Sequence, residues 1–129
     1  FPYSDYGVNQ VGYCIAAHND TIKNNPGLAK RFIRATMEAY AKAEKNPDAA
    51  VDAIADIVGG SMAEEAGRKQ SREVLDVTLG ILYSGANKNR VLGLNVPSDW
   101  ESMVKLMKEY NDLDRNSKAS DFYTNQFVN

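Results

Sequence analysis

Apolar and polar positions recur with a helical period over most of the chain. The clearest case is residues 24–47, "NNPGLAKRFIRATMEAYAKAEKNP". Asn25 suits the capping position and Pro26 the first position of a helix, because proline lacks the amide hydrogen that a first turn leaves unbonded. The pattern predicts a long helix that begins at Pro26. Its apolar stripe, expected to face the core, is formed by Leu28, Phe32, Ala35 and Ala39, widened by Ile33, Thr36 and Tyr40.

Two more helices are predicted directly after the first. Asn46-Pro47 repeats the start signal, and Gly59-Gly60 ends the segment "DAAVDAIADIV". The expected apolar face of this helix is Ala50, Ile54, Ile57 and Val58. The next helix is predicted from Ser61, with Glu64 at the capping-box spacing, to about Tyr83. Each of its two internal glycines, Gly67 and Gly80, costs a helix ~1 kcal/mol relative to alanine.

The last part of the chain predicts a loop, a helix and a short turn. Residues 84–97, "SGANKNRVLGLNVP", are rich in residue types common in loops and are predicted to form one. Ser98 and Glu101 have capping-box spacing before the helical segment "DWESMVKLMKEYNDL", in which Trp100 is expected to pack in the core. The closing "KASDFYTNQFVN" predicts at most a short helix or turn.

One segment near the start has a different pattern. "QVGYCIAAH", Gln10 to His18, is rich in residues found in strands and is apolar on both faces. This predicts a strand covered by helices on both sides, as in an α/β domain, with Cys14 as a small buried side chain. The fold class is therefore α/β and mostly helical, with one or two strands near the N-terminus and four to five helices. Because a strand needs neighbours, either the rest of the sheet lies upstream or copies of the chain pair with each other.

Charge and composition narrow the classes of function. The 129 residues carry 15 basic and 17 acidic side chains, a net charge of −2. This argues against nucleic acid or an anionic membrane as the main partner, since both favour a basic excess. The single cysteine excludes an internal disulfide, and no apolar run approaches the roughly 20 residues that span a bilayer. The opening "FPYSDYG" has neither an initiator methionine nor a signal segment, so we expect that translation starts upstream.

The order of several short motifs resembles a known family. A "DYG" turn precedes the strand, "NP" opens a helix containing "RF", a second "NP" follows, and a "DW" helix precedes the closing "YTNQF". Across all 129 residues this order resembles the C-terminal part of NMT1/THI5-like substrate-binding proteins. Those are type II periplasmic binding proteins, in which two α/β lobes close on a ligand and the protein serves an ABC importer.

The resemblance implies an organisation and a function. Residues 1–129 are expected to form a single partial domain, with residues 1–18 as crossover segment and strand and residues 19–129 as helices coating the first lobe. The implied function is solute binding without catalysis or cofactor. The implied ligand is a small polar molecule, such as an aminopyrimidine precursor of thiamine or a sulfonate or nitrate-type anion. The implied partner is an ABC permease, the implied location is the periplasm or cell surface, and the incomplete sheet predicts self-association.

The resemblance places the first turn of the chain near the ligand cleft. Its ligand-binding candidates are Ser4, Asp5, Tyr6 and Gly7, which offer a hydroxyl, a carboxylate, an aromatic face and exposed amides. The alternative is a plain turn, for which aspartate and glycine are common. His18, the one histidine, is expected to be structural or exposed, because a metal site needs three or four ligands and no second histidine or cysteine lies near.

Two basic clusters and two other functions remain open. The clusters, Lys30-Arg31-Arg34 and Arg68-Lys69-Arg72, suit either an acidic partner or, more commonly, the solvated faces of helices. One alternative function is an enzyme of thiamine-pyrimidine synthesis on the same fold, which would carry a cysteine-rich motif upstream. The other is a free-standing helical interaction domain.

Overall fold

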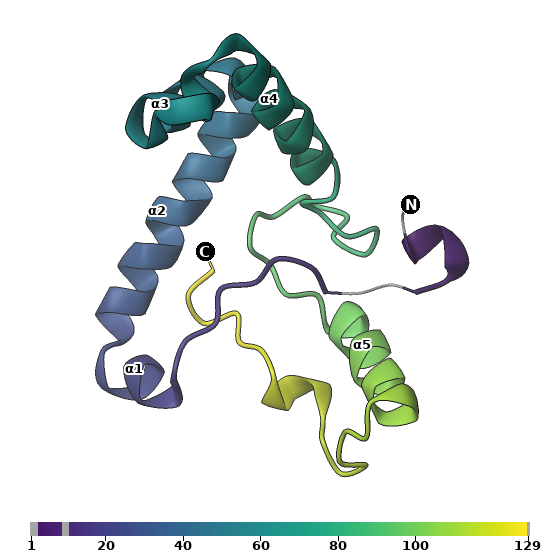
Figure 1. Cartoon of the computed structure of the whole chain (residues 1–129). Coiled ribbons are helices and arrows are strands. Elements are labelled where there is room, and N and C mark those ends of the chain that lie inside the picture. The colour runs from purple at the N-terminus through teal and green to yellow at the C-terminus, as the bar shows by residue number, and fades with distance from the viewer. Residues whose placement is uncertain (1–2, 9–10, 129) are drawn as a thin grey trace. The chain divides into compact units, whose positions relative to one another are not determined.

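The computed structural model describes residues 3–8 and 11–128, and its regular structure is helical (Figure 1). Within those residues there are five α-helices, which confirms a mostly helical chain with four to five helices. None of the described helices is both long and apolar enough to cross a membrane. The α-helices are α1 (Asn19–Asn24), α2 (Pro26–Lys45), α3 (Pro47–Val58), α4 (Glu65–Gly80) and α5 (Pro97–Tyr110), and the 3-10 turns are η1 (Tyr3–Tyr6), η2 (Gly60–Ala63) and η3 (Ala119–Asp121).

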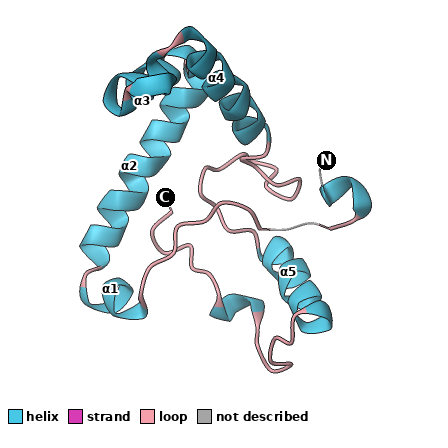
Figure 2. Cartoon of the chain, viewed as in Figure 1, coloured by secondary structure: helices cyan, strands magenta, loops and turns pink. Residues whose placement is uncertain are grey.

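The strand predicted over Gln10–His18 does not form in the part of this chain that the structure describes. Gln10 lies outside the described residues, and residues 11–18 run as a loop (Figure 2). A strand is defined by hydrogen bonds to a neighbour. Among the described residues no other segment pairs with this one, so its β-compatible side chains do not produce a ladder. Cys14 is consequently exposed rather than buried, and the prediction of a buried thiol is wrong.

The helix starts predicted at Pro26 and Pro47 are confirmed, and so is the asparagine cap of the second of these helices. The Asn25 carbonyl oxygen accepts from the Leu28 amide at 3.0 Å, which closes the first turn of α2 at Pro26. The Asn46 side chain accepts from the Ala49 amide at 3.2 Å and so caps α3. The Asn46 cap satisfies a backbone amide that would otherwise lack a partner in the first turn of α3.

Both predicted capping boxes are wrong. Ser61 lies in η2, and α4 begins four residues later at Glu65, with Glu64 as a cap whose side chain makes no capping bond. Ser98 lies inside α5, which begins at Pro97 after Val96. In the first case two consecutive glycines with positive φ, Gly59 at 65° and Gly60 at 59°, turn the chain into η2 before α4 can start. In the second, proline takes the first helical position itself.

Close packing explains why a glycine stands at position 67, inside a helix that glycine destabilises. A Cβ atom added to Gly67 would overlap the carbonyl oxygen of Ser61 and lie 2.9 Å from the Cα of Met62. The first turn of α4 therefore approaches the backbone of η2 more closely than any side chain allows. The glycine lets α4 fold back from η2 at this tight corner.

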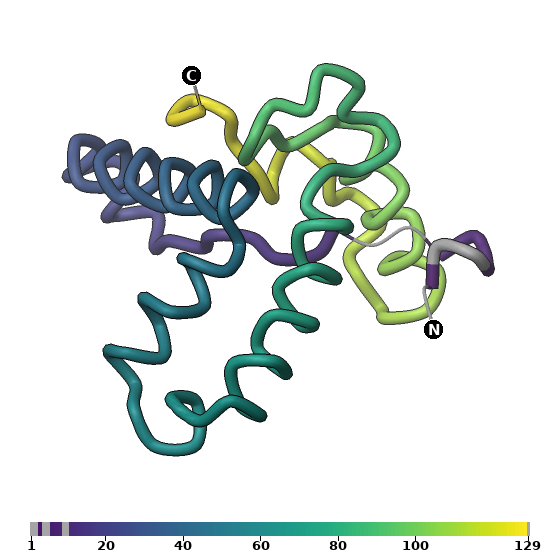
Figure 3. Tube along the Cα trace, turned by 90° about the horizontal axis from the view of Figure 1, so that it is seen from above, coloured from purple at the N-terminus to yellow at the C-terminus, as the bar shows by residue number. Residues whose placement is uncertain are grey.

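The chain divides into two compact units, Arg34–Tyr83 and the combination of Phe1–Ile33 with Ser84–Asn129. In the Arg34–Tyr83 unit, α3 and α4 run side by side in opposite directions, joined through η2 (Figure 3). The buried apolar side chains here are Ala43, Val51 and Ala55. The Tyr83 hydroxyl donates to Glu44 Oε2 at 2.9 Å and ties the residues after α4 to the end of α2.

The other unit is organised by asparagine side chains as much as by apolar packing. Asn87 is buried; its Nδ2 donates to the Val91 carbonyl at 2.8 Å, and its Oδ1 accepts from the Val91 amide at 3.0 Å. Val104 on α5 is the buried apolar residue of this unit among those described. A buried amide with both ends bonded holds a loop in one conformation, because breaking either bond would leave a polar group unsatisfied.

Several apolar faces predicted to be in the core are exposed. Leu28 and Phe32 on α2 are exposed, as are Ile54, Ile57 and Val58 on α3. The α3 helix buries Val51 and Ala55 instead, on the side next to α4. The α3–α4 hairpin covers only one side of each of its two helices, so Ile54, Ile57 and Val58 lack a covering layer among the described elements.

Candidate functional site

The predicted ligand-binding residues lie in one compact turn. Residues 3–6 form η1, and the Val8 amide closes the turn by donating to the Tyr3 carbonyl at 3.1 Å. Gly7 follows with φ of 79°, a conformation that residues with a Cβ rarely adopt. Ser4, Asp5, Tyr6 and Gly7 are therefore brought together by a local fold that depends on glycine.

The turn presents an aromatic ring and open backbone. Tyr6 is 66% exposed, and nothing lies within 4 Å of the position that a Cβ of Gly7 would take. The backbone of Ser4 and Asp5 belongs to η1, while their side chains lie outside what the structure describes. This geometry suits contact with a small molecule from one side: a ring to stack on and a backbone that a ligand can approach closely.

An exposed extended segment follows the turn. Tyr13 is 84% exposed, and Cys14 and Ile15 are exposed as well. From residue 11 to His18 the backbone makes no hydrogen bond within the described chain until the His18 carbonyl accepts from Thr21 and Ile22. The segment thus offers unpaired backbone groups to which another strand can bond.

His18 acts as the cap of α1. Its Nδ1 accepts from the Asp20 amide at 3.2 Å and lies 3.3 Å from the Asp20 carboxylate. The structure therefore assigns His18 the structural role expected from the sequence. Across residues 3–8 and 11–128, no three carboxylate, imidazole or thiol groups gather as metal ligands would.

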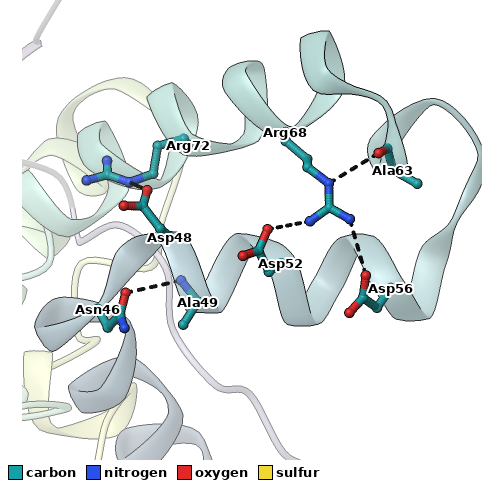
Figure 4. A network of polar contacts seen from close by, with 8 residues as sticks. All are labelled: Asn46, Asp48, Ala49, Asp52, Asp56, Ala63, Arg68 and Arg72. Carbon is teal, nitrogen blue, oxygen red and sulfur yellow. Dashed lines mark hydrogen bonds and ion pairs between the residues drawn. The ribbon is translucent and has the colours of Figure 1, made fainter.

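The second basic cluster is engaged within the chain. Arg68 reaches across from α4 to Asp52 and Asp56 on α3, and its Nε donates to the Ala63 carbonyl at 3.2 Å (Figure 4). Arg72, one turn on, pairs with Asp48 at 2.8 Å and with Asp76. The three aspartates of α3 follow each other at intervals of four residues and so lie along one side of that helix.

This network keeps both guanidinium groups charged. Hydrogen bonding to Asp56 raises the pKa of Arg68 above its ordinary value, and hydrogen bonding to Asp76 does the same for Arg72. The two arginines form ion pairs that link α4 to α3, rather than a basic surface for a partner. In the first cluster, Arg34 pairs weakly with Glu38 at 3.7 Å on the solvated side of α2, the more common of the two expected roles.

An aromatic and amide cluster joins α5 to the end of the chain. Trp100 stacks on Tyr123 with ring centroids 5.4 Å apart, and its Nε1 donates to Asn95 Oδ1 at 3.0 Å. Asn125 Oδ1 accepts from the Asn95 amide at 2.9 Å, and its Nδ2 donates to the Asn95 carbonyl at 2.8 Å. Trp100 therefore packs within the chain, as expected.

The asparagine pairing was missed in the sequence. Asn95 and Asn125 are 30 positions apart, and nothing in a single sequence marks two asparagines as partners. The available signal was that both occur in segments, "GLNVP" and "YTNQF", that also carry the family resemblance.

Comparison with known proteins bears on the first part of the chain. Residues 1–50 match the family model described as NMT1/THI5 like. No curated protein and no solved structure matches the chain significantly. The resemblance seen in the motifs is therefore confirmed for a segment that contains the η1 turn, the extended residues 11–18, α1 and α2. Residues 1–50 are therefore similar to NMT1/THI5-like proteins.

Proposed function

We propose that this chain is part of a solute-binding protein that delivers a small polar molecule to an ABC importer. The observation that carries the proposal is the family match over residues 1–50, which includes the predicted ligand-binding turn. The ligand classes that suit it are an aminopyrimidine precursor of thiamine and a sulfonate or nitrate-type anion. In this proposal the protein binds and releases its ligand unchanged, outside the cytoplasm, and hands it to a membrane permease.

The turn supplies the ligand contacts in this proposal. Tyr6 offers an exposed ring on which a flat heterocycle stacks, and the open backbone at Gly7 accepts close approach by polar ligand atoms. The carboxylate that Asp5 contributes to this turn is of the type that accepts hydrogen bonds from exocyclic amino groups. A neutral aminopyrimidine uses all three features, whereas an anion would use the amides and avoid the carboxylate.

The extended segment supplies the link to the rest of the binding protein. Residues 11–18 have unbonded backbone groups and apolar side chains on both faces, including the exposed Tyr13 and Ile15. Pairing with a neighbouring strand would satisfy those groups and cover those side chains. We infer that this segment completes a sheet in a type II lobe, and that the adjacent turn is positioned at the ligand cleft by that pairing.

A thermal-shift screen on the complete reading frame that contains residues 1–129 tests the proposal. The panel holds aminopyrimidines, sulfonates, nitrate and riboflavin-like compounds, and the 129-residue chain is the control. A ligand that binds only the folded protein raises the melting temperature of that protein, and the rise grows with the logarithm of ligand concentration over Kd. A rise in the long protein that the short chain lacks supports ligand binding at a cleft that needs both parts.

The same sample separates a binding protein from an enzyme. After incubation, the bound compound is released by denaturation and analysed by chromatography and mass spectrometry. Recovery of the unchanged compound supports transport. Conversion into a pyrimidine product would instead favour the alternative of a biosynthetic enzyme, and no stabilisation by any compound would favour a helical interaction domain.

A further inference from the structure

We propose that the groove between α5 and residues 115–119 binds a small organic anion that carries a phosphate or sulfonate group. This site lies within one compact unit and shares no residue with the turn at residues 4–7, so it does not depend on the proposed function. The groove has a volume of about 550 Å³, which is in the usual range of small-molecule sites.

Four of the nine residues that line the groove are cationic. They are Lys105 and Lys108 on α5 and Arg115 and Lys118 on the returning loop. Two carboxylates, Glu101 and Glu109, leave a net charge of +2 on the lining of a chain whose overall charge is −2. Within the described residues, none of the four cations forms an ion pair with a carboxylate. In this they differ from Arg68 and Arg72, which α3 neutralises.

The backbone of the loop holds the cations on one side of α5. Asp112 adopts φ of 53° just after the helix, and the Leu113 amide then donates back to the Met107 carbonyl at 3.2 Å. Lys108 Nζ donates to the Arg115 carbonyl at 2.9 Å, which ties the loop to the helix. An ammonium group has three donors, so two remain on Lys108 for an anion.

The groove also has an apolar part. Val104, 7% exposed, and Ala119 are the apolar residues of its lining. An oxyanion head group would meet the lysine and arginine donors, and a compact apolar body would cover these two side chains. A tetrahedral oxyanion matches the arrangement better than a simple halide, because several donors approach from the helix and from the loop.

Titration of the isotope-labelled 129-residue chain with phenyl phosphate, followed by amide NMR, tests the proposal. Benzenesulfonate, inorganic phosphate and phenol are the comparison ligands. We expect saturable shifts confined to residues 101–119 with phenyl phosphate and benzenesulfonate, weaker binding of inorganic phosphate and none of phenol. Rising salt should weaken binding, since the groove is open to screening ions.

Matched charge-removal variants complete the test. K105Q/R115Q removes one lysine and one arginine from the groove without breaking the Lys108 tie, and R31Q/K69Q removes the same charges elsewhere. Binding should weaken about tenfold or more in the first variant and stay within about twofold of wild type in the second. Equal loss in both variants, shifts spread over the whole surface, or no saturation at millimolar ligand would overturn the proposal. The wild-type shift map decides the location even if K105Q/R115Q fails to fold.

Discussion

Gly67 offers the sharpest test of the packing between η2 and α4. In the G67A variant, the new methyl group would overlap the Ser61 carbonyl oxygen and lie 2.8 Å from its carbonyl carbon. Both neighbours are backbone atoms, so the strain cannot be relieved by rotating a side chain. Forcing a methyl group into such a site costs about 1–3 kcal/mol, and the alanine returns at most ~1 kcal/mol in helix propensity. We expect G67A to lose up to about 2 kcal/mol of unfolding free energy.

Gly80 provides the matched control in the same helix. It is the last residue of α4, it is exposed, and nothing lies within 4 Å of the position of an added Cβ. G80A should therefore be neutral or stabilising, by at most ~1 kcal/mol. The two identical substitutions thus have opposite expected signs.

Urea unfolding monitored by circular dichroism at 222 nm measures both variants against the wild-type chain. The expected result is a lower midpoint for G67A and an unchanged or higher one for G80A, with similar slopes. Equal stabilisation by both substitutions would show that η2 does not approach α4 closely, and the account of this corner would then be refuted.

Three further predictions use other parts of the chain. N46A removes the side-chain cap of α3 and should cost about 1 kcal/mol in urea unfolding; no change would mean that the cap contributes nothing. Hydrogen bonding to Glu109 raises the pKa of Tyr110. This hydrogen bond therefore stabilises the folded chain at pH below the ordinary tyrosine pKa, and the stabilisation is lost as pH rises through the raised pKa. NMR titration should show that E109Q lowers the Tyr110 pKa towards ~10, and an unaltered midpoint would exclude this contact. Ile57 is 85% exposed, so I57K should reduce self-association in sedimentation velocity without loss of helix, whereas a wild-type chain that stays monomeric at all concentrations would contradict the expected association.

Local helix signals were read correctly where one residue type determines the geometry. Proline at the first position of α2 and α3, asparagine at the cap of α3 and paired glycines after α3 each act through the backbone of their own segment. Such effects need no knowledge of the rest of the fold. The capping boxes failed because a serine and a glutamate at the right spacing compete with nearby glycine or proline for the helix start.

Properties that depend on distant neighbours were not predictable in the same way. The apolar pattern of residues 10–18 is that of a strand, yet a strand requires a partner that the described chain does not provide. On the side of α3 that faces α4, Asp52 and Asp56 pair with Arg68, a contact between distant segments that the apolar pattern does not reveal. The groove beside α5 depends on how the loop after Tyr110 folds back, which periodicity does not reveal.

The candidate ligand turn was found through the family resemblance, and its compact geometry follows from Gly7. The residue types alone predict a turn at Asp5-Tyr6-Gly7 but do not predict that it binds a ligand. The family match over residues 1–50 adds the expectation that the turn contacts a solute. One pair of tyrosines, Tyr6 and Tyr13, allows this expectation to be tested against a close control.

The most direct measurement is calorimetric titration of the complete reading frame with the best ligand from the screen, comparing wild type, Y6L and Y13L. Tyr6 lies in the turn and Tyr13 in the extended segment that follows it, and both rings are exposed here. If the turn contacts the ligand, Y6L should weaken binding about tenfold, in line with loss of an aromatic contact worth ~1.5 kcal/mol. Y13L should bind with nearly the wild-type Kd. Wild-type affinity in Y6L, or an equal loss in both variants, would contradict the assignment of residues 4–7 as the ligand-binding turn.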